Sequence, residues 1–262
     1  MLTLQDQIGT THTFANAPQR IISLVPSQTE LLFDLGLEKS IIGVTKFCVH
    51  PYYAKSVCKV IGGTKKVHYE KIRLLKPDII IANKEENTEE IVAKLREICP
   101  VWVTDILTIE DNMQMITDFG KIFNKRTEAL KWSDKINNSL KNFRDFIQPI
   151  PIRKVAYFIW REPFMVAGSG NFIDEMLKLN HFENIYTEPR YPEIKIENIR
   201  NDGDPEFILL SSEPYPFKDE HAIEVGHHTP AVILFVDGEM FSWYGTRLLK
   251  ALEYFKNLHQ RL

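Results

Sequence analysis

The chain of 262 residues contains only three cysteines, Cys48, Cys58 and Cys99, and no two of them stand at CxxC spacing. Zinc ribbons and thioredoxin-like redox sites depend on that spacing, so both readings lose their main support. One disulfide with a free thiol is an alternative to three separate buried thiols. We expect the three separate thiols.

Long apolar runs and an excess of one charge are also missing. No hydrophobic stretch approaches the ~18 residues needed to cross a bilayer. The 32 basic and 35 acidic residues are interspersed and leave a formal net charge of −3, so the basic stripe of a nucleic-acid-binding surface is absent. With 44% hydrophobic and 26% charged residues, the composition is that of a globular protein, and the length suits one large domain or two of moderate size.

The first eighteen residues, MLTLQDQIGTTHTFANAP, contain no lysine or arginine. They therefore lack the basic start and apolar core of a secretory signal peptide. We expect two short strands around Gly9. The sequence leaves open whether a leader has been removed or the protein stays in the cytoplasm.

Short apolar segments alternate with helix-forming segments along the chain, and Pro26, Pro77 and Pro100 stand directly beside three of them. The expected strands are residues 20–25, 41–44, 78–82, 101–104, 155–159, 207–210 and 232–235. The expected helices are residues 69–75, 88–98, 108–123, 171–179, 196–200 and 244–258. Ser27 and Glu30 have capping-box spacing at the start of a further helix that Gly36 ends. This alternation implies βαβ units and mostly parallel sheets.

One expected helix, residues 125–148, is about 35 Å long, the length of a whole lobe. A helix–proline–strand pattern at residues 69–81 recurs at residues 196–209, on the other side of this helix. We therefore expect an α/β fold with two similar Rossmann-like lobes, residues 1–118 and 151–262. A linking helix region, residues 119–150, would join them, with a ligand cleft between the lobes. Chance similarity of such short pieces is the alternative to duplication.

Enzyme signatures are weak. Residues 167–171 (AGSGN) fit neither GxSxG nor GxGxxG, and we expect a turn that caps the following helix. His227 and His228 have no third ligand at zinc-site spacing, so a solvated loop is the better interpretation. Asp237 followed by Gly238 predicts a turn. We expect a binding protein rather than an enzyme, with no catalytic residue.

Large or polar side chains instead gather where expected strands end. Ligands of open α/β sheets bind beyond the carboxyl ends of the strands, and aromatic walls with few polar contacts suit a large, flat, partly apolar ligand. Core packing is the alternative for each single aromatic residue. The candidate ligand-binding residues are Phe47, His50, Thr64, Arg161, Phe164, Tyr191, Trp243 and Arg247.

Four segments carry a family resemblance: residues 20–35 (RIISLVPSQTELLFDL), 62–82 (GGTKKVHYEKIRLLKPDIIIA), 163–177 (PFMVAGSGNFIDEML) and 191–199 (YPEIKIENI). They resemble the helical-backbone (class III) substrate-binding proteins of ABC importers. Within that class the cobalamin receptors are most similar, with iron–siderophore and haem receptors as relatives. The likeness extends from about residue 18 to the end of the chain.

The resemblance implies a transported cargo, cobalamin or a related metal chelate, and no catalytic cofactor. It also implies delivery to an ABC permease dimer by a monomeric receptor that is periplasmic or lipid-anchored outside the cytoplasm. No nucleic-acid partner is expected. Because no signal peptide is visible, a cytoplasmic location stays open.

The resemblance further assigns roles to single residues. Glu70 and Glu197 match the glutamates, one per lobe, that dock these receptors onto permease arginines, and carboxylate–guanidinium pairs can be bidentate. A first-turn acid favoured by the helix dipole is the alternative for either one. Thr64 stands where cobalamin receptors can carry an aromatic residue, and His50 where a tyrosine can stand. The His50 imidazole could ligate cobalt or iron, or be a hydrogen-bonded loop histidine.

A second hypothesis is a cytoplasmic sensor or a metallocluster scaffold of the same fold. A scaffold needs cysteine ligands, and all three cysteines fall in the first lobe.

Overall fold

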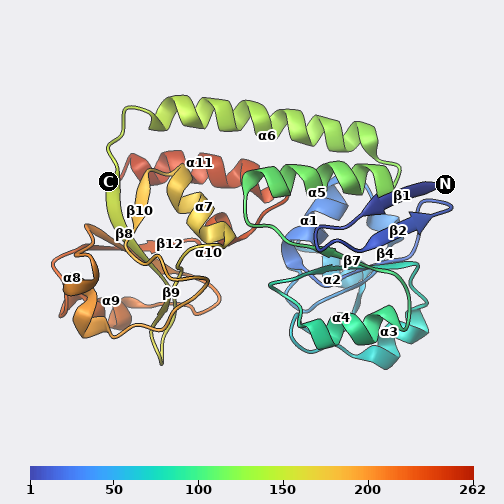
Figure 1. Cartoon of the computed structure of the whole chain (residues 1–262), viewed down its shortest axis with the longest axis horizontal. Coiled ribbons are helices and arrows are strands. Elements are labelled where there is room, and N and C mark those ends of the chain that lie inside the picture. The colour runs from blue at the N-terminus through green and yellow to red at the C-terminus, as the bar shows by residue number, and fades with distance from the viewer. The chain divides into compact units, whose positions relative to one another are not determined.

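The computed structural model describes residues 1–262 and divides the chain into two compact units (Figure 1). Unit 1 contains residues 1–137 and 244–248, and unit 2 contains residues 138–243 and 249–262. The chain first passes from unit 1 to unit 2 inside the long helix α6 (Arg126–Ile147). Each unit is α/β with a predominantly parallel sheet, as the sequence predicts.

Unit 1 is built on a parallel sheet of strand order β5-β4-β3-β6-β7. Its strands are β3 (Ile21–Ser23), β4 (Ile41–Val44), β5 (Lys59–Val60), β6 (Ile79–Asn83) and β7 (Val101–Thr104). Its helices are α1 (Pro26–Asp34), η1 (Glu38–Ser40), α2 (Ala54–Val57), α3 (Tyr69–Leu75), α4 (Glu89–Arg96) and α5 (Ile109–Ile122). Every residue of β3, β6 and β7 is buried, which explains their near-continuous apolar sequences.

The two strands expected around Gly9 are confirmed as an antiparallel hairpin of β1 (Leu2–Gln5) and β2 (Thr11–Phe14). The Asp6 carboxylate accepts a hydrogen bond from the Val103 amide at 3.2 Å, and the His12 ring lies 5.2 Å from that of Trp102. The hairpin therefore covers β7, an edge strand whose amides would otherwise be open to pairing with another chain.

Unit 2 has a parallel sheet of order β10-β8-β11-β12, and β9 pairs antiparallel with β8. Its strands are β8 (Arg153–Trp160), β9 (Met165–Val166), β10 (Phe182–Asn184), β11 (Phe207–Ser211) and β12 (Val232–Val236). Its helices are α7 (Phe172–Leu179), η2 (Ile196–Asn198), α8 (Ile199–Asp202), α9 (Asp219–Gly226) and α10 (Gly238–Ser242). Helix α11 (Arg247–His259) starts in unit 1 and continues in unit 2.

The two sheets share one strand order when their strands are matched along the chain. The order β4-β3-β6-β7 in unit 1 corresponds to β10-β8-β11-β12 in unit 2. Helix α1 follows β3 as α7 follows β8, and α3 precedes β6 as η2 and α8 precede β11. The shared order and connections support the internal repeat that the sequence indicates.

Two local predictions are wrong. The capping box at Ser27 and Glu30 does not form, because Pro26 takes the first helical position and Val25 is the N-cap without a side-chain cap. The last helix begins at Arg247 rather than Tyr244, since Gly245 has a φ of 80° and cannot be helical.

Candidate functional site

Three candidate ligand-binding residues follow the carboxyl ends of strands in unit 1. Phe47 and His50 come after β4, and Thr64 comes after β5. The Phe47 side chain is 48% exposed, with the Lys46 ammonium 4.8 Å from its ring centroid. A Cβ at Gly63 would lie 3.1 Å from the Phe47 ring, so the glycine allows the ring to approach the backbone closely. Phe47 is thus an exposed aromatic surface at the edge where ligands of such sheets bind.

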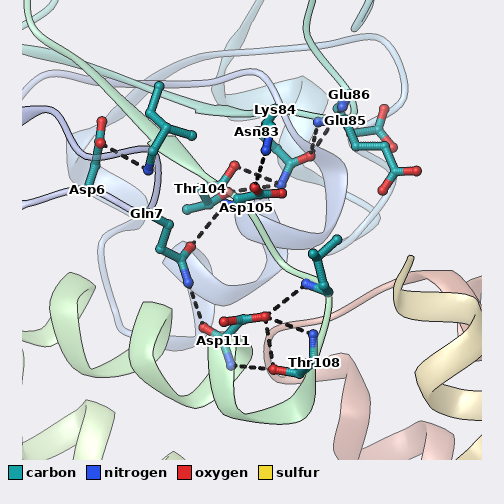
Figure 2. A network of polar contacts seen from close by, with 12 residues as sticks. Asp6, Gln7, Asn83, Lys84, Glu85, Glu86, Thr104, Asp105, Thr108 and Asp111 are labelled. Atoms are coloured by element: carbon teal, nitrogen blue, oxygen red, sulfur yellow. Dashed lines mark hydrogen bonds and ion pairs between the residues drawn. The ribbon is translucent and has the colours of Figure 1, made fainter. Parts of the chain in front are cut away.

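A buried polar network fixes the same edge of unit 1 (Figure 2). Asn83, the last residue of β6, donates to the Thr104 carbonyl at 3.2 Å and hydroxyl at 3.1 Å. Its Oδ1 accepts hydrogen bonds from the amides of Glu85 at 2.9 Å and Glu86 at 3.1 Å. Burial raises the pKa of the Glu86 carboxyl above its usual range, and neighbouring Glu85 adds to the increase. The edge therefore places a half-buried carboxyl beside the strand ends.

The backbone carrying Thr64 is tied into this network. The Thr64 side chain is buried, and its carbonyl accepts from Asn87 Nδ2 at 2.9 Å. Lys65 Nζ donates to the Glu85 carbonyl at 2.6 Å, and Lys84 forms an ion pair with Asp105 at 2.5 Å. These lysines are thus already engaged within unit 1.

The network also reaches the hairpin and helix α5. Gln7 Oε1 accepts from the Asp105 amide at 3.2 Å, and Gln7 Nε2 donates to the Asp111 carbonyl at 3.0 Å (Figure 2). The Asp111 side chain closes a capping box with Thr108, which begins α5. The loop after β7 is therefore held both by Gln7 and by the capping box that begins α5.

Arg247 lies in the short segment 244–248 that belongs to unit 1. Its side chain is almost fully buried, and its Nε donates to Glu30 Oε2 of α1 at 2.8 Å. In the same segment, the Gly245 amide donates to Asn112 Oδ1 at 2.6 Å. The ion pair commits the Arg247 guanidinium to a partner within unit 1, so a role in ligand binding stays a prediction.

In unit 2, Arg161 follows β8 and is also held by carboxylates. Its Nε donates to Glu224 Oε2 at 2.8 Å, and its Nη1 pairs with Glu162 at 2.5 Å. The hydrogen bond with Glu224 raises the pKa of Arg161 further above its usual range. The Arg161 charge is therefore already balanced inside unit 2.

The aromatic candidates of unit 2 lie at two places. Phe164 is half-buried against Phe158, with ring centroids 5.7 Å apart, and its carbonyl accepts from the Ile194 amide at 2.9 Å. This bond brings the segment of half-buried Tyr191 beside Phe164. Trp243 lies after β12 and α10, is 8% exposed, and donates its indole N–H to Glu213 at 2.7 Å.

The two candidate docking glutamates occupy equivalent positions. Glu70 lies in the first turn of α3 with its side chain 83% exposed, and Glu197 lies exposed on η2. These helices precede β6 and β11, the matching strands of the two sheets.

The structure does not gather a metal site from its own side chains. No group of three or more His, Cys, Asp or Glu residues is placed to hold an ion, so His50 stands as a single candidate ligand. Cys48 and Cys58 are buried and Cys99 is half-buried, all as free thiols. Burial raises the pKa of Cys58 to about 11 and that of Cys99 to about 12. Protonated, separated thiols are poor ligands for a metallocluster.

Two polar residues at the strand ends escaped the sequence analysis. Asn83 ends β6 directly after an apolar run, and Glu213 follows β11 after two serines. The signal that singled out Phe47, a large or polar residue where a strand ends, applies equally to both.

No helix of the structure combines the length and the apolar character needed to span a membrane.

Comparison with known sequences identifies a family. The sequence model of the family described as "Periplasmic binding protein" matches residues 21–227. The Bacillus subtilis protein YvrC, described as an uncharacterized ABC transporter substrate-binding lipoprotein, is 28% identical over 196 residues, covering 70% of this chain and 60% of YvrC. The vitamin B12-binding protein of Vibrio cholerae is 27% identical over 216 residues, covering 80% of this chain and 73% of that protein.

Solved structures share the fold. The periplasmic vitamin B12-binding protein BtuF of Vibrio cholerae superposes with a TM-score of 0.80 at 22% identity, over 94% of this chain and 99% of that one. A periplasmic heme-binding protein of Pseudomonas aeruginosa gives a TM-score of 0.80 at 20% identity, over 92% of both chains. Since the family model spans most of the sequence and the fold agrees, this chain belongs to the periplasmic binding protein family.

Proposed function

We propose that the protein is the substrate-binding component of an ABC importer and captures cobalamin or a related metal chelate, such as haem or an iron–siderophore complex. The observation that carries this proposal is the family match over residues 21–227. The relatives named for vitamin B12, heme and siderophore binding support the class of cargo. The lipoprotein relative supports a location outside the cytoplasm.

We propose that the residues beyond the strand ends of both units contact the cargo. Phe47, Phe164, Tyr191 and Trp243 would supply aromatic surface for a flat macrocycle or chelate. His50, Thr64, Arg161 and Arg247 would supply polar contacts, and His50 would be the residue that ligates a metal centre. Glu70 and Glu197 would carry the loaded protein to the permease, because two equivalent exposed carboxylates suit a two-fold symmetric partner.

Ligand titration tests the cargo. The purified protein is titrated with cyanocobalamin, haemin and ferric siderophores, followed by absorbance and by tryptophan fluorescence. We expect one of these complexes to bind with a Kd in the micromolar range or tighter. Failure of all three classes to bind would refute the proposal.

The metallocluster-scaffold hypothesis finds no support. Cys48 donates to or accepts from the hydroxyls of Thr29 at 3.1 Å and Thr45 at 3.3 Å, and no cluster of ligating side chains forms. The relatives are described as an ABC transporter substrate-binding lipoprotein and as vitamin B12-binding proteins.

A further inference from the structure

Glu213 is the acidic residue that comes two positions after the end of β11. Its Oε1 accepts the Trp243 indole N–H at 2.7 Å and the Ser242 hydroxyl at 3.0 Å. Its other carboxylate oxygen, Oε2, receives no hydrogen bond from the chain. A hydrogen bond to an ionised carboxylate is about twice as strong as one between neutral groups. Glu213 therefore fixes the orientation of the indole while half of its own hydrogen-bonding capacity stays open.

The turn around Glu213 is closely packed and leaves the carboxylate little freedom. A Cβ at Gly238 would lie 2.5 Å from Glu213 Cγ and 2.5 Å from Ser211 Oγ, so only glycine fits there. The Gly238 amide donates to Ser212 Oγ at 3.0 Å, and Ser211 Oγ donates to the Glu213 carbonyl at 2.6 Å. The loop after β11 and the start of α10 are thus held together by close packing and hydrogen bonds.

The electrostatic surroundings of Glu213 are acidic. Burial raises the pKa of the Glu213 carboxyl, and Glu239 and Asp237 at the start of α10 raise it further. Arg161, the cationic ligand-binding candidate of unit 2, is already paired with Glu224 and Glu162. An anionic chelate at this edge would meet carboxylates, whereas a ligand N–H or O–H would find an open acceptor.

We propose that Glu213 is a positioning residue that orients Trp243 through Oε1 and, through its open Oε2, makes the site prefer an uncharged, amide-bearing corrinoid over anionic haem or ferric carboxylate siderophores. This inference rests on the proposed function, because it assigns the cargo class of the same site.

Two substitutions at Glu213 distinguish its role in orienting Trp243 from the effect of its negative charge. Glu213→Gln keeps an oxygen that can accept the indole N–H and removes the charge, whereas Glu213→Ala removes both. Glu206→Gln is the matched control, since Glu206 lies just before β11, at the other end of the strand, and pairs with Arg153 at 2.6 Å.

The positioning role of Glu213 is measured on the protein without cargo. The protein is labelled with ¹⁵N-tryptophan, and the indole N–H resonance of Trp243 is assigned by its loss in Trp243→Phe. We expect this resonance to move upfield in Glu213→Ala, to move less in Glu213→Gln, and to stay in place in Glu206→Gln. An unchanged resonance in Glu213→Ala would overturn the positioning role.

The preference of the site for uncharged over anionic cargo is measured by titrating each variant with cyanocobalamin and with haemin. We expect Glu213→Ala to weaken cyanocobalamin binding by about 5- to 10-fold, the effect of one lost hydrogen bond. Glu213→Gln should stay within about 3-fold of wild type for cyanocobalamin and bind haemin about 3- to 10-fold more tightly, because a nearby negative charge is gone. Equal haemin affinity in Glu213→Gln and wild type would overturn the charge role. If wild type binds neither complex, the cargo assignment fails together with the proposed function, while the indole spectrum still decides the positioning role.

Discussion

Trp243 and Tyr244 are consecutive residues whose side chains are held by different units. The Trp243 indole donates to Glu213 in unit 2 at 2.7 Å, whereas the Tyr244 hydroxyl accepts from Gln28 Nε2 in unit 1 at 3.1 Å. The chain changes unit at the peptide bond between them. A residue predicted to contact cargo is therefore directly joined to the segment that Glu30 and Asn112 anchor in unit 1.

The buried pair of Arg247 and Glu30 should make this anchor sensitive to substitution. Arg247→Ala leaves the Glu30 carboxylate buried without its cation, and we expect a loss of about 3–5 kcal/mol in the free energy of unfolding. Urea denaturation followed by circular dichroism measures the change.

The matched control is Arg73→Ala. Arg73 forms an exposed pair with Glu70 at 3.8 Å, and such surface pairs contribute about 0–1 kcal/mol. Equal denaturation midpoints for the two variants would contradict the structural role of Arg247.

Much of the fold could be predicted from local sequence. The expected bounds of strands 41–44 and 101–104 and of helix 69–75 coincide with β4, β7 and α3. Pro100 directly precedes β7 and Pro77 lies two positions after α3, so a proline marks one limit of each of these two elements. Strands β9 and β10 were missed, since two or three residues show no periodicity and pair only because β8 lies beside them. The capping-box prediction failed because Pro26, one residue earlier, decides where α1 begins.

The candidate site was less accessible from sequence than the fold. Phe47 was identified by its position after an expected strand and Thr64 by its position after Gly62 and Gly63, both from local sequence alone. The partners of Arg247 and Trp243 lie 217 and 30 positions away, so only the folded chain shows that their polar atoms are engaged. Long-range pairing of this kind leaves no local pattern.

Docking through Glu70 and Glu197 predicts a separation of binding from transport. The double variant Glu70→Ala/Glu197→Ala should keep cargo affinity within about 2-fold, because neither exposed side chain follows a strand end, yet lose uptake into vesicles that contain the cognate permease. Glu110→Ala/Glu220→Ala is the control, since both residues are exposed first-turn acids of other helices, α5 and α9. If the double variant binds cargo poorly but transports normally, the assignment of Glu70 and Glu197 to permease docking is wrong.

The hairpin should loosen at acidic pH through Asp6. Burial disfavours its charged form, but hydrogen bonds from His12 and from the amides of Thr10 and Val103 outweigh burial, so the pKa of Asp6 lies below its usual value. A carboxyl with a lowered pKa in the folded state adds stability above its unfolded pKa, and this stability is lost as the pH falls through the folded value.

Hydrogen exchange of residues 2–14 tests this pH dependence. We expect amide protection in the hairpin to fall from pH 6 to pH 3 more steeply than in β6. Asp6→Asn should lower protection at pH 6 and remove most of that pH dependence. A hairpin that responds to pH equally in wild type and Asp6→Asn would rule out Asp6 as the cause.

Gly238 should tolerate no side chain, because the start of α10 lies against the loop after β11. In Gly238→Ala the new Cβ would stand 2.5 Å from both Ser211 Oγ and Glu213 Cγ, and we expect a loss of about 1–3 kcal/mol in the free energy of unfolding. Gly226→Ala is the control, since a Cβ there meets only Ile233 Cδ1 at 3.6 Å and a helical alanine stabilises by up to about 1 kcal/mol. Thermal denaturation of both variants measures the contrast. If Gly238→Ala melts with or above wild type, the loop after β11 is not held against α10, and the orientation of Trp243 cannot depend on that packing.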